Sequence, residues 1–140
     1  MRNNFNTGDI ISIVVYDFVN HEKIEEAWTA IYNDSSQYDV SFFFALDNHN
    51  HIHINDYYEF QDGEHIRYAT REEKDNLFNN LKNNFLISYP NAAKYISDTT
   101  MMDLENWLMN ILNIDDDITP DFIMDVRDEV CRRIAERRRR

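Results

Sequence analysis

The stretch RYATREEKDNLFNNLKNNF, residues 67–85, marks the point where strand-like periodicity gives way to helical periodicity. Thr70, followed three residues later by Glu73, forms a capping box, in which each side chain bonds the other residue's backbone N–H. Apolar residues then recur at the spacing of one helix face, and these are Leu77, Phe78, Leu81 and Phe85. The sequence therefore predicts an amphipathic helix that begins at about residue 70.

Before residue 70 the sequence is typical of short β-strands. A β-branched and aromatic run follows the Gly8-Asp9 turn signal over residues 10–19, and a second run covers residues 27–32. Apolar residues then alternate at period two over residues 38–46. This alternation predicts that five side chains share one face of a third strand: Tyr38, Val40, Phe42, Phe44 and Leu46.

Further short strands are predicted around Ile52 and Ile54, over residues 57–60, and at residues 66–68 after the Asp62-Gly63 turn signal. About five strands joined by short turns are typical of a small SH3-like barrel or a bent antiparallel sheet. We expect this β-rich unit to cover residues 1–69.

After the first helix we expect three more. Pro90 opens a short one that runs to residue 96, and Thr99 or Thr100 caps the next. The last begins after Thr119-Pro120. The expected inward-facing residues of the last two helices are Leu104, Trp107, Leu108, Ile111, Leu112, Ile123, Val126, Val130 and Ile134. The sequence thus predicts one α+β domain over residues 1–140, with a helical segment at 70–140.

The composition is that of a globular chain with a hydrophobic core. Of 140 residues, 43% are hydrophobic, and Gly and Pro occur only twice each, so no flexible linker is expected. Cys131 is the single cysteine and has no internal partner. Because we find neither a signal-like nor a membrane-spanning apolar run, we expect a cytoplasmic protein without membrane contact.

The charge is negative and unevenly distributed. The formal net charge is −12, and residues 1–126 carry −16 while residues 127–140 carry +4. A field of this sign repels nucleic acid and attracts proteins with a basic surface. We therefore expect a basic protein partner and consider nucleic acid an unlikely one, with solubility alone as the alternative interpretation.

Three histidines alternate at His49, His51 and His53 and could converge on a transition metal. Against this, Ile52 and Ile54 would take the core-facing positions and leave the imidazoles towards solvent. Same-face neighbours on one strand also lie about 6.5–7 Å apart, which makes a three-histidine site awkward. We expect a polar strand or turn here, with metal binding as the weaker alternative.

No catalytic motif stands out. The sequence has no GxSxG, P-loop, GxGxxG or HExxH pattern, and two glycines do not make a phosphate-binding loop. Cys131 lies beside Val130 and Ile134, where a buried structural thiol is expected rather than a nucleophile. We expect no enzymatic activity and no cofactor.

Surplus aromatics and charged runs are the candidate partner-binding residues. Phe43 falls between Phe42 and Phe44, and two adjacent tyrosines on one strand cannot both point inward, so exposed aromatics edged by acids are expected. For the terminal arginines we expect a solvated helix end first and a contact to another protein or to a second copy next. A contact to nucleic-acid phosphates is the third alternative. The candidates are Phe43, Tyr57, Tyr58, Asp115, Asp116, Asp117, Arg137, Arg138, Arg139 and Arg140.

Residues 67–81 resemble a segment R-x-A-T-x-E-E-K-x-x-L-F-x-x-L of small proteins from gut Bacteroides-type bacteria and their phages, crAss-like phages included. In those proteins too, a short β-rich unit that opens near a Gly-Asp turn precedes the helix, and the similarity covers about residues 5–85. The resemblance implies a phage or bacterial source and no particular activity. The seventeen asparagines and scarce glycine agree with an AT-rich genome.

These observations lead to three functional hypotheses. The first is a phage-encoded, non-enzymatic interaction module whose acidic surface inhibits a host nucleic-acid-binding or defence protein. The second is a virion-associated subunit that self-assembles through its arginine-rich C-terminus. The third is a metal-binding protein that uses His49, His51 and His53.

Overall fold

The computed structural model of the 140-residue chain describes residues 5–19, 22–34, 40–59, 64–94, 98–115 and 117–139, with the backbone alone at 16–19, 22–25 and 137–139. The chain divides into two compact units, residues 1–77 and residues 78–140. We call them the β unit and the helical unit. The boundary falls inside the first helix, so that its first two turns belong to the β unit.

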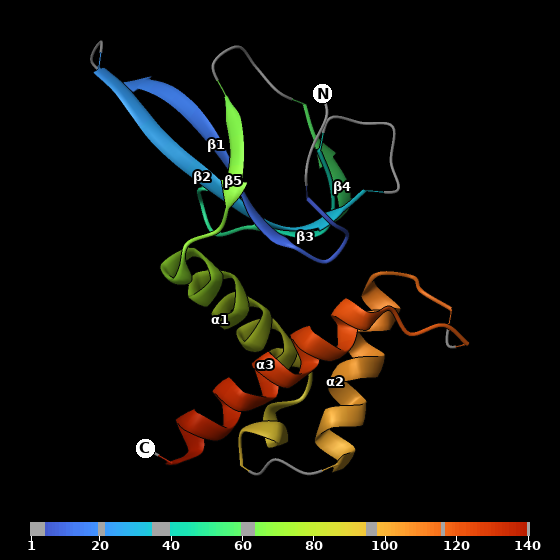
Figure 1. The fold of residues 1–140 in the computed structure, drawn as a ribbon. Coiled ribbons are helices and arrows are strands. Elements are labelled where there is room, and N and C mark those ends of the chain that lie inside the picture. Colours follow the sequence, from blue (N-terminus) through green and yellow to red (C-terminus); the bar gives the residue numbers. More distant parts are fainter. Residues whose placement is uncertain are drawn as a thin grey trace. The chain divides into compact units, whose positions relative to one another are not determined.

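The β unit is a five-stranded antiparallel sheet with strand order β4-β3-β2-β1-β5, and Figure 1 shows that it is strongly curved. β1 to β4 follow one another as a meander, and β5 returns to pair with β1. The bent antiparallel sheet followed by helices confirms the predicted α+β class. The strands are β1 (Ile10–Val19), β2 (Glu22–Asn33), β3 (Val40–Leu46), β4 (Ile52–Tyr58) and β5 (His65–Tyr68).

Two strand boundaries differ from the prediction. β2 begins at Glu22 rather than at residue 27, because it pairs with β1 along the full length of that strand. β4 is one strand that runs through Tyr57 to Tyr58, and its whole length pairs with β3. Pairing with a neighbour therefore extends both strands beyond the apolar runs that indicated them.

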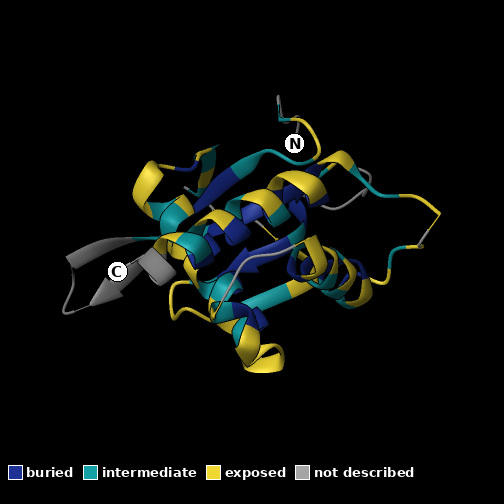
Figure 2. Ribbon diagram, turned by 90° about the horizontal axis from the view of Figure 1, so that it is seen from below, coloured by how far each residue is buried: buried dark blue, intermediate teal, exposed yellow. Residues whose placement is uncertain are grey.

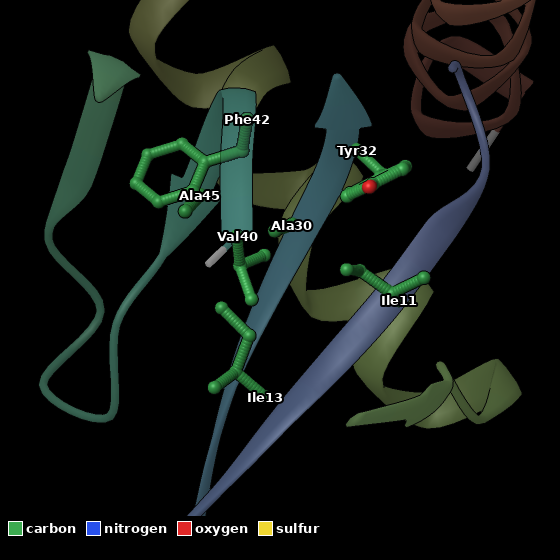
Figure 3. Close-up of a cluster of buried hydrophobic side chains, with 7 residues drawn as sticks. All are labelled: Ile11, Ile13, Ala30, Tyr32, Val40, Phe42 and Ala45. Carbon is green, nitrogen blue, oxygen red and sulfur yellow. The ribbon is translucent and has the colours of Figure 1, made fainter. Parts of the chain in front are cut away.

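One face of the sheet carries the core of the β unit, shown in Figure 3. Ile11 and Ile13 of β1 are fully buried there, and the phenol ring of Tyr32 packs beside them. Phe5, Val15, Trp28, Tyr58 and Ile66 pack around this cluster and are partly buried. The cluster itself consists of Ile11, Ile13, Ala30, Tyr32, Val40, Phe42 and Ala45.

The prediction that Tyr38, Val40, Phe42, Phe44 and Leu46 share one face is wrong beyond Phe42, and Tyr38 lies outside the described residues. The register with β2 shifts there: Tyr32 pairs with Phe42, whereas Ile31 pairs with Phe44, so that Phe43 is an extra residue on β3. Such a bulge exchanges the two faces of a strand. Phe42 and Ala45 therefore lie in the core cluster, while Phe44 is fully buried on the opposite face.

α1 (Arg71–Ser88) begins as predicted. The Glu73 N–H donates to Thr70 Oγ1 at 3.2 Å, and the Thr70 N–H donates to Glu73 Oε1 at 2.8 Å, which confirms the capping box. Arg67 of β5 donates to both Glu73 carboxylate oxygens at 2.6 and 3.1 Å. This pair fixes the end of the sheet to the start of the helix.

The helical unit contains the rest of α1, the 3-10 helix η1 (Pro90–Ala93), α2 (Asp98–Ile111) and α3 (Asp121–Arg139). The short helix predicted from Pro90 to residue 96 is thus a single 3-10 turn, and residues 95–97 lie outside the described part. Figure 2 shows buried and exposed residues on the same helices, as amphipathic helices require. The buried side chains include Leu81, Phe85, Leu104, Leu108, Leu112, Ile123, Val126, Val130 and Ile134, which confirms their predicted orientation. Trp107 and Ile111, which were also predicted to face inward, are half-buried.

Within the described residues, no helix is both long enough and apolar enough to cross a bilayer.

Candidate functional site: an aromatic–acidic cluster beside the edge strand

The structure brings together five side chains that are separated in the sequence, on the core-bearing face of the sheet at its β4 edge. We call them the aromatic–acidic cluster: Trp28, Asp47, His53, Tyr58 and Glu64. Strand register places His53 and Tyr58 on this face, because His53 pairs with Ala45 and Tyr58 pairs with Val40. Ala45 and Val40 both belong to the core cluster.

Three rings of the cluster contact one another in a row. The imidazole of His53 stacks on the indole of Trp28, with ring centroids 4.7 Å apart and an interplanar angle of 25°. Tyr58 also contacts the Trp28 ring, in an edge-to-face arrangement with ring centroids 5.2 Å apart. Both separations fall in the favourable range for aromatic pairs. The result is a half-buried aromatic surface at the border of the core.

The expectation that all three histidines point to solvent is wrong for His53. Its side chain is 33% exposed and lies against Trp28, whereas Ile54, expected in the core, is 40% exposed. The bulge at Phe43 is the reason, since it exchanges the faces of β3 and of the partner positions on β4. His49 and His51 lie in the turn before β4 and are exposed.

Asp47 organises the turn between β3 and β4 and holds His53. Its Oδ1 atom accepts hydrogen bonds from the backbone N–H groups of His49 and His51 at 2.8 and 2.9 Å. Its Oδ2 atom lies 2.8 Å from His53 Nε2. Burial alone would raise the pKa of Asp47, but these hydrogen bonds outweigh it and lower the pKa to about 2. Asp47 is therefore ionised at neutral pH.

Tyr58 and Glu64 form the other end of the cluster. The Tyr58 hydroxyl donates to Glu64 Oε2 at 2.7 Å, across the connection between β4 and β5. Burial raises the pKa of Tyr58 above its ordinary range, and the adjacent Glu64 carboxylate raises it further. The phenol therefore stays protonated at neutral pH and remains a hydrogen-bond donor.

This arrangement suits recognition of a cation better than covalent chemistry. It combines ring surfaces with two carboxylates, whereas acyl or phosphoryl transfer requires an activated nucleophile or a phosphate-binding loop. Cys131, the thiol of the chain, belongs to the helical unit; it is buried, and burial raises its pKa. In the part of the chain that the structure describes, no group of three His, Cys, Asp or Glu side chains could hold a metal ion.

The predicted aromatic candidates lie in different environments. Phe43 is half-buried at the bulge of β3. Tyr57 is 39% exposed, while its neighbour Tyr58 belongs to the cluster, so only one of the two points inward, as predicted. Asp115 and Asp117 are exposed in a turn after α2, where Asp115 Oδ1 accepts the Asp117 N–H at 3.2 Å. Asp116 lies outside the described residues.

Arginines of α3 are bonded to carboxylates of the same unit. Arg127 bonds Glu105 of α2 and Asp128, and Arg132 bonds Glu129 and Glu136 on its own helix. Arg133 bonds Glu129 and lies over the Phe78 ring, with its guanidinium carbon 5.6 Å from the centroid. The side chains of Arg137, Arg138 and Arg139 and the whole of Arg140 are outside the described part.

The helical unit also contains a pocket of about 270 Å³ at the start of α2. Its lining combines hydroxyl and amide side chains with apolar ones, and it includes the carboxyl group of Asp103. The lining residues are Ser88, Tyr89, Pro90, Asn91, Ala92, Thr99, Thr100 and Asp103. This set includes no basic residue and no thiol.

Four members of the cluster were not predicted as partner-binding residues. Trp28, Asp47 and Glu64 carry no local motif, and His53 was considered only as a metal ligand. One signal was available: Trp28, Ala30 and Tyr32 alternate along β2 and so share a face.

No protein-family model, no curated protein and no solved structure matches this chain.

Proposed function

We propose that this chain is a non-enzymatic, acidic protein-interaction module that binds a partner with a basic surface. The observation that carries the proposal is that arginines are paired within the molecule, while many carboxylates face solvent. Arg67, Arg127, Arg132 and Arg133 are engaged inside the molecule by carboxylates. The engaged carboxylates are Glu73, Glu105, Asp128, Glu129 and Glu136. The exposed acids include Asp56, Glu59, Glu72, Asp98, Asp115, Asp117, Asp121 and Asp125.

The exposed carboxylates determine the electrostatic potential around the protein. A net charge of −12 on 140 residues gives the surface a negative potential that speeds encounter with basic proteins and disfavours nucleic acid. Proteins that bind nucleic acids do so with basic surfaces whose lysines and arginines neutralise the phosphates. The proposed target is therefore such a surface on a host transcription or defence protein, and the proposed source is a phage, on the basis of the segment at residues 67–81.

The first test is binding at several salt concentrations. An arginine-rich peptide of about twelve residues is titrated into the protein, with a glutamate-rich peptide as the control. We expect the arginine-rich peptide to bind, and its affinity to fall at least about tenfold between about 50 mM and about 500 mM salt, because the Debye length shortens over that range. Affinity that does not respond to salt would contradict the proposal.

The same salt steps then identify the partner. The tagged protein captures proteins from a bacterial lysate, and rising salt elutes them for mass spectrometry. Elution of one nucleic-acid-binding protein names the target. Recovery of the chain itself, abolished by deletion of residues 137–140, would favour the self-assembling subunit instead.

A further inference from the structure

We propose that the aromatic–acidic cluster is the anchor site for one arginine side chain of the basic partner. The inference rests on the proposed function and adds the location and the ligand chemistry. An arginine side chain has an apolar stem and a planar cationic head, and the cluster offers a counterpart to each.

The apolar counterpart is the row of rings. Trp28 lies between His53 and Tyr58, and it packs against the core cluster, which keeps the row in place without a ligand. A guanidinium group stacks on aromatic rings, and tryptophan is the strongest aromatic partner for a cation. Since the rings are already ordered, binding would cost little side-chain entropy at the site.

The polar counterpart is the pair of carboxylates at the two ends of the row. Asp47 is held ionised by its hydrogen bonds, and Glu64 receives its bond from a phenol that stays neutral. A carboxylate next to a half-buried ring is partly shielded from water, so its attraction to a cation is stronger than on an open surface. Glu26, which accepts a hydrogen bond from Asn48, adds another acid on β2 nearby in the register.

The position of the cluster makes it accessible to a partner. β4, which supplies His53 and Tyr58, is one of the two edge strands of the sheet in the described part of the chain. His53 keeps a third of its side chain exposed, and Trp28 and Tyr58 are also partly exposed. A segment of a partner that lies along this edge can therefore place a side chain on the row of rings.

The protein uses the same recognition chemistry internally. In the helical unit, Arg133 lies over the Phe78 ring while its Nε donates to Glu129 at 2.9 Å. That site combines one ring and one carboxylate with a guanidinium. The aromatic–acidic cluster has three rings and two carboxylates, so we assign it the same kind of ligand, supplied by another molecule.

The test combines mapping with matched variants. In the mapping experiment, the peptide Gly-Gly-Arg-Gly-Gly is titrated and followed by NMR through the indole N–H signals of Trp28 and Trp107, the two tryptophans of the chain. Citrulline and lysine versions of the peptide are the controls. We expect the arginine peptide to shift the Trp28 signal, the lysine version to shift it less, and both the citrulline version and Trp107 to show no shift.

The variants are tested with the arginine-rich peptide. We expect Trp28→Leu to weaken binding about tenfold and Glu64→Gln about threefold. Tyr57→Leu removes an exposed ring that is not part of the cluster, and Glu72→Gln removes one of many exposed charges of the same unit. Each is a matched control that measures the general loss of a ring or a charge, and each should change affinity less than about twofold. Glu64→Gln keeps an acceptor for Tyr58, so it tests the charge even if Trp28→Leu does not fold.

The two proposals fail in different ways. If the arginine-rich peptide binds with the expected salt dependence but Trp28→Leu and Glu64→Gln bind as the controls do, the anchor site is wrong and the proposed function stands. If no basic peptide binds at low salt, the proposed function itself is wrong. A lysine peptide that shifts Trp28 as strongly as the arginine peptide would overturn the assignment of a guanidinium.

Discussion

The β unit and the helical unit place their charged groups in opposite roles. In the β unit the central charged groups are carboxylates: Asp47 holds a turn and His53, and Glu73 holds Arg67 and the start of α1. In the helical unit the central groups are arginines, since Arg127 and Arg133 each bond carboxylates across or along the helices.

This difference shows that the acidic residues of the chain do not all have the same role. Some carboxylates stabilise the fold, and these are the ones that are buried or accept hydrogen bonds from neighbouring groups. Burial would raise the pKa of Glu73, but the hydrogen bonds from Arg67 and from the Thr70 N–H lower it to about 2. The acids that remain exposed are the ones available to a partner. Of the four predictions that follow, those on acid dependence and on the arginines of α3 test this division directly, and the other two test the framework that holds the structural acids in place.

The largest expected effect comes from the core at the bulge of β3. Phe44→Ala should lower the free energy of unfolding by about 3–5 kcal/mol, because the ring is fully buried. Phe43→Ala, at the half-buried extra residue, should cost clearly less. Urea unfolding of both variants measures the difference. Equal losses would show that Phe43 is as well packed as Phe44 and would contradict its placement as a half-buried extra residue.

Next in size is the acid dependence of the β unit. Because the pKa values of Asp47 and Glu73 are lowered to about 2 in the folded state, both residues stabilise the fold above their ordinary pKa of about 4. This contribution is lost as the pH falls from about 4.5 through 2. Solvent screening reduces it to about 1 kcal/mol for each residue, and so to about 2 kcal/mol for the two together.

Unfolding measured at several pH values checks this dependence. Asp47→Asn and Glu73→Gln should each flatten the acid limb of the stability curve. Glu72→Gln, at the exposed neighbour of Glu73, should leave the slope as in the original protein. A slope that only Glu72→Gln reduced would contradict the assigned roles.

A smaller effect is expected for the arginines of α3. Arg127 is 15% exposed and joins α3 to Glu105 of α2, so Arg127→Ala should cost about 1.5 kcal/mol. Arg132 is 52% exposed and bonds its own helix, so Arg132→Ala should cost less than about 0.5 kcal/mol. Thermal unfolding of the two variants tests whether an ion pair between helices stabilises the fold more than an ion pair within one helix.

The smallest effect concerns the start of α1. Thr70→Ala removes the side-chain acceptor of the Glu73 N–H and should lower stability by about 1 kcal/mol. Thr70→Ser keeps the hydroxyl and should restore most of it. Denaturant midpoints provide the measurement, and a Thr70→Ser variant as unstable as Thr70→Ala would point to lost packing instead of capping.

How much could be predicted from the sequence differs between the two units. In α1 the capping box and the buried stripe were predicted residue by residue, because both depend on neighbours within one or two turns. The 3-10 turn after Pro90 was predicted as a longer helix, although the proline at its start was interpreted correctly. In the β unit the strands were found, but the face of Phe44 and of His53 was not.

The sequence by itself determined the α+β class, the order of strands and helices, the helix start at Thr70 and the negative charge. These properties arise from local periodicity, capping and composition. The tertiary structure alone decided the bulge at Phe43 and the meeting of Trp28, Asp47, His53, Tyr58 and Glu64. Both depend on which residues of different strands lie opposite each other, and pairing between distant segments leaves no mark in the local pattern of either one.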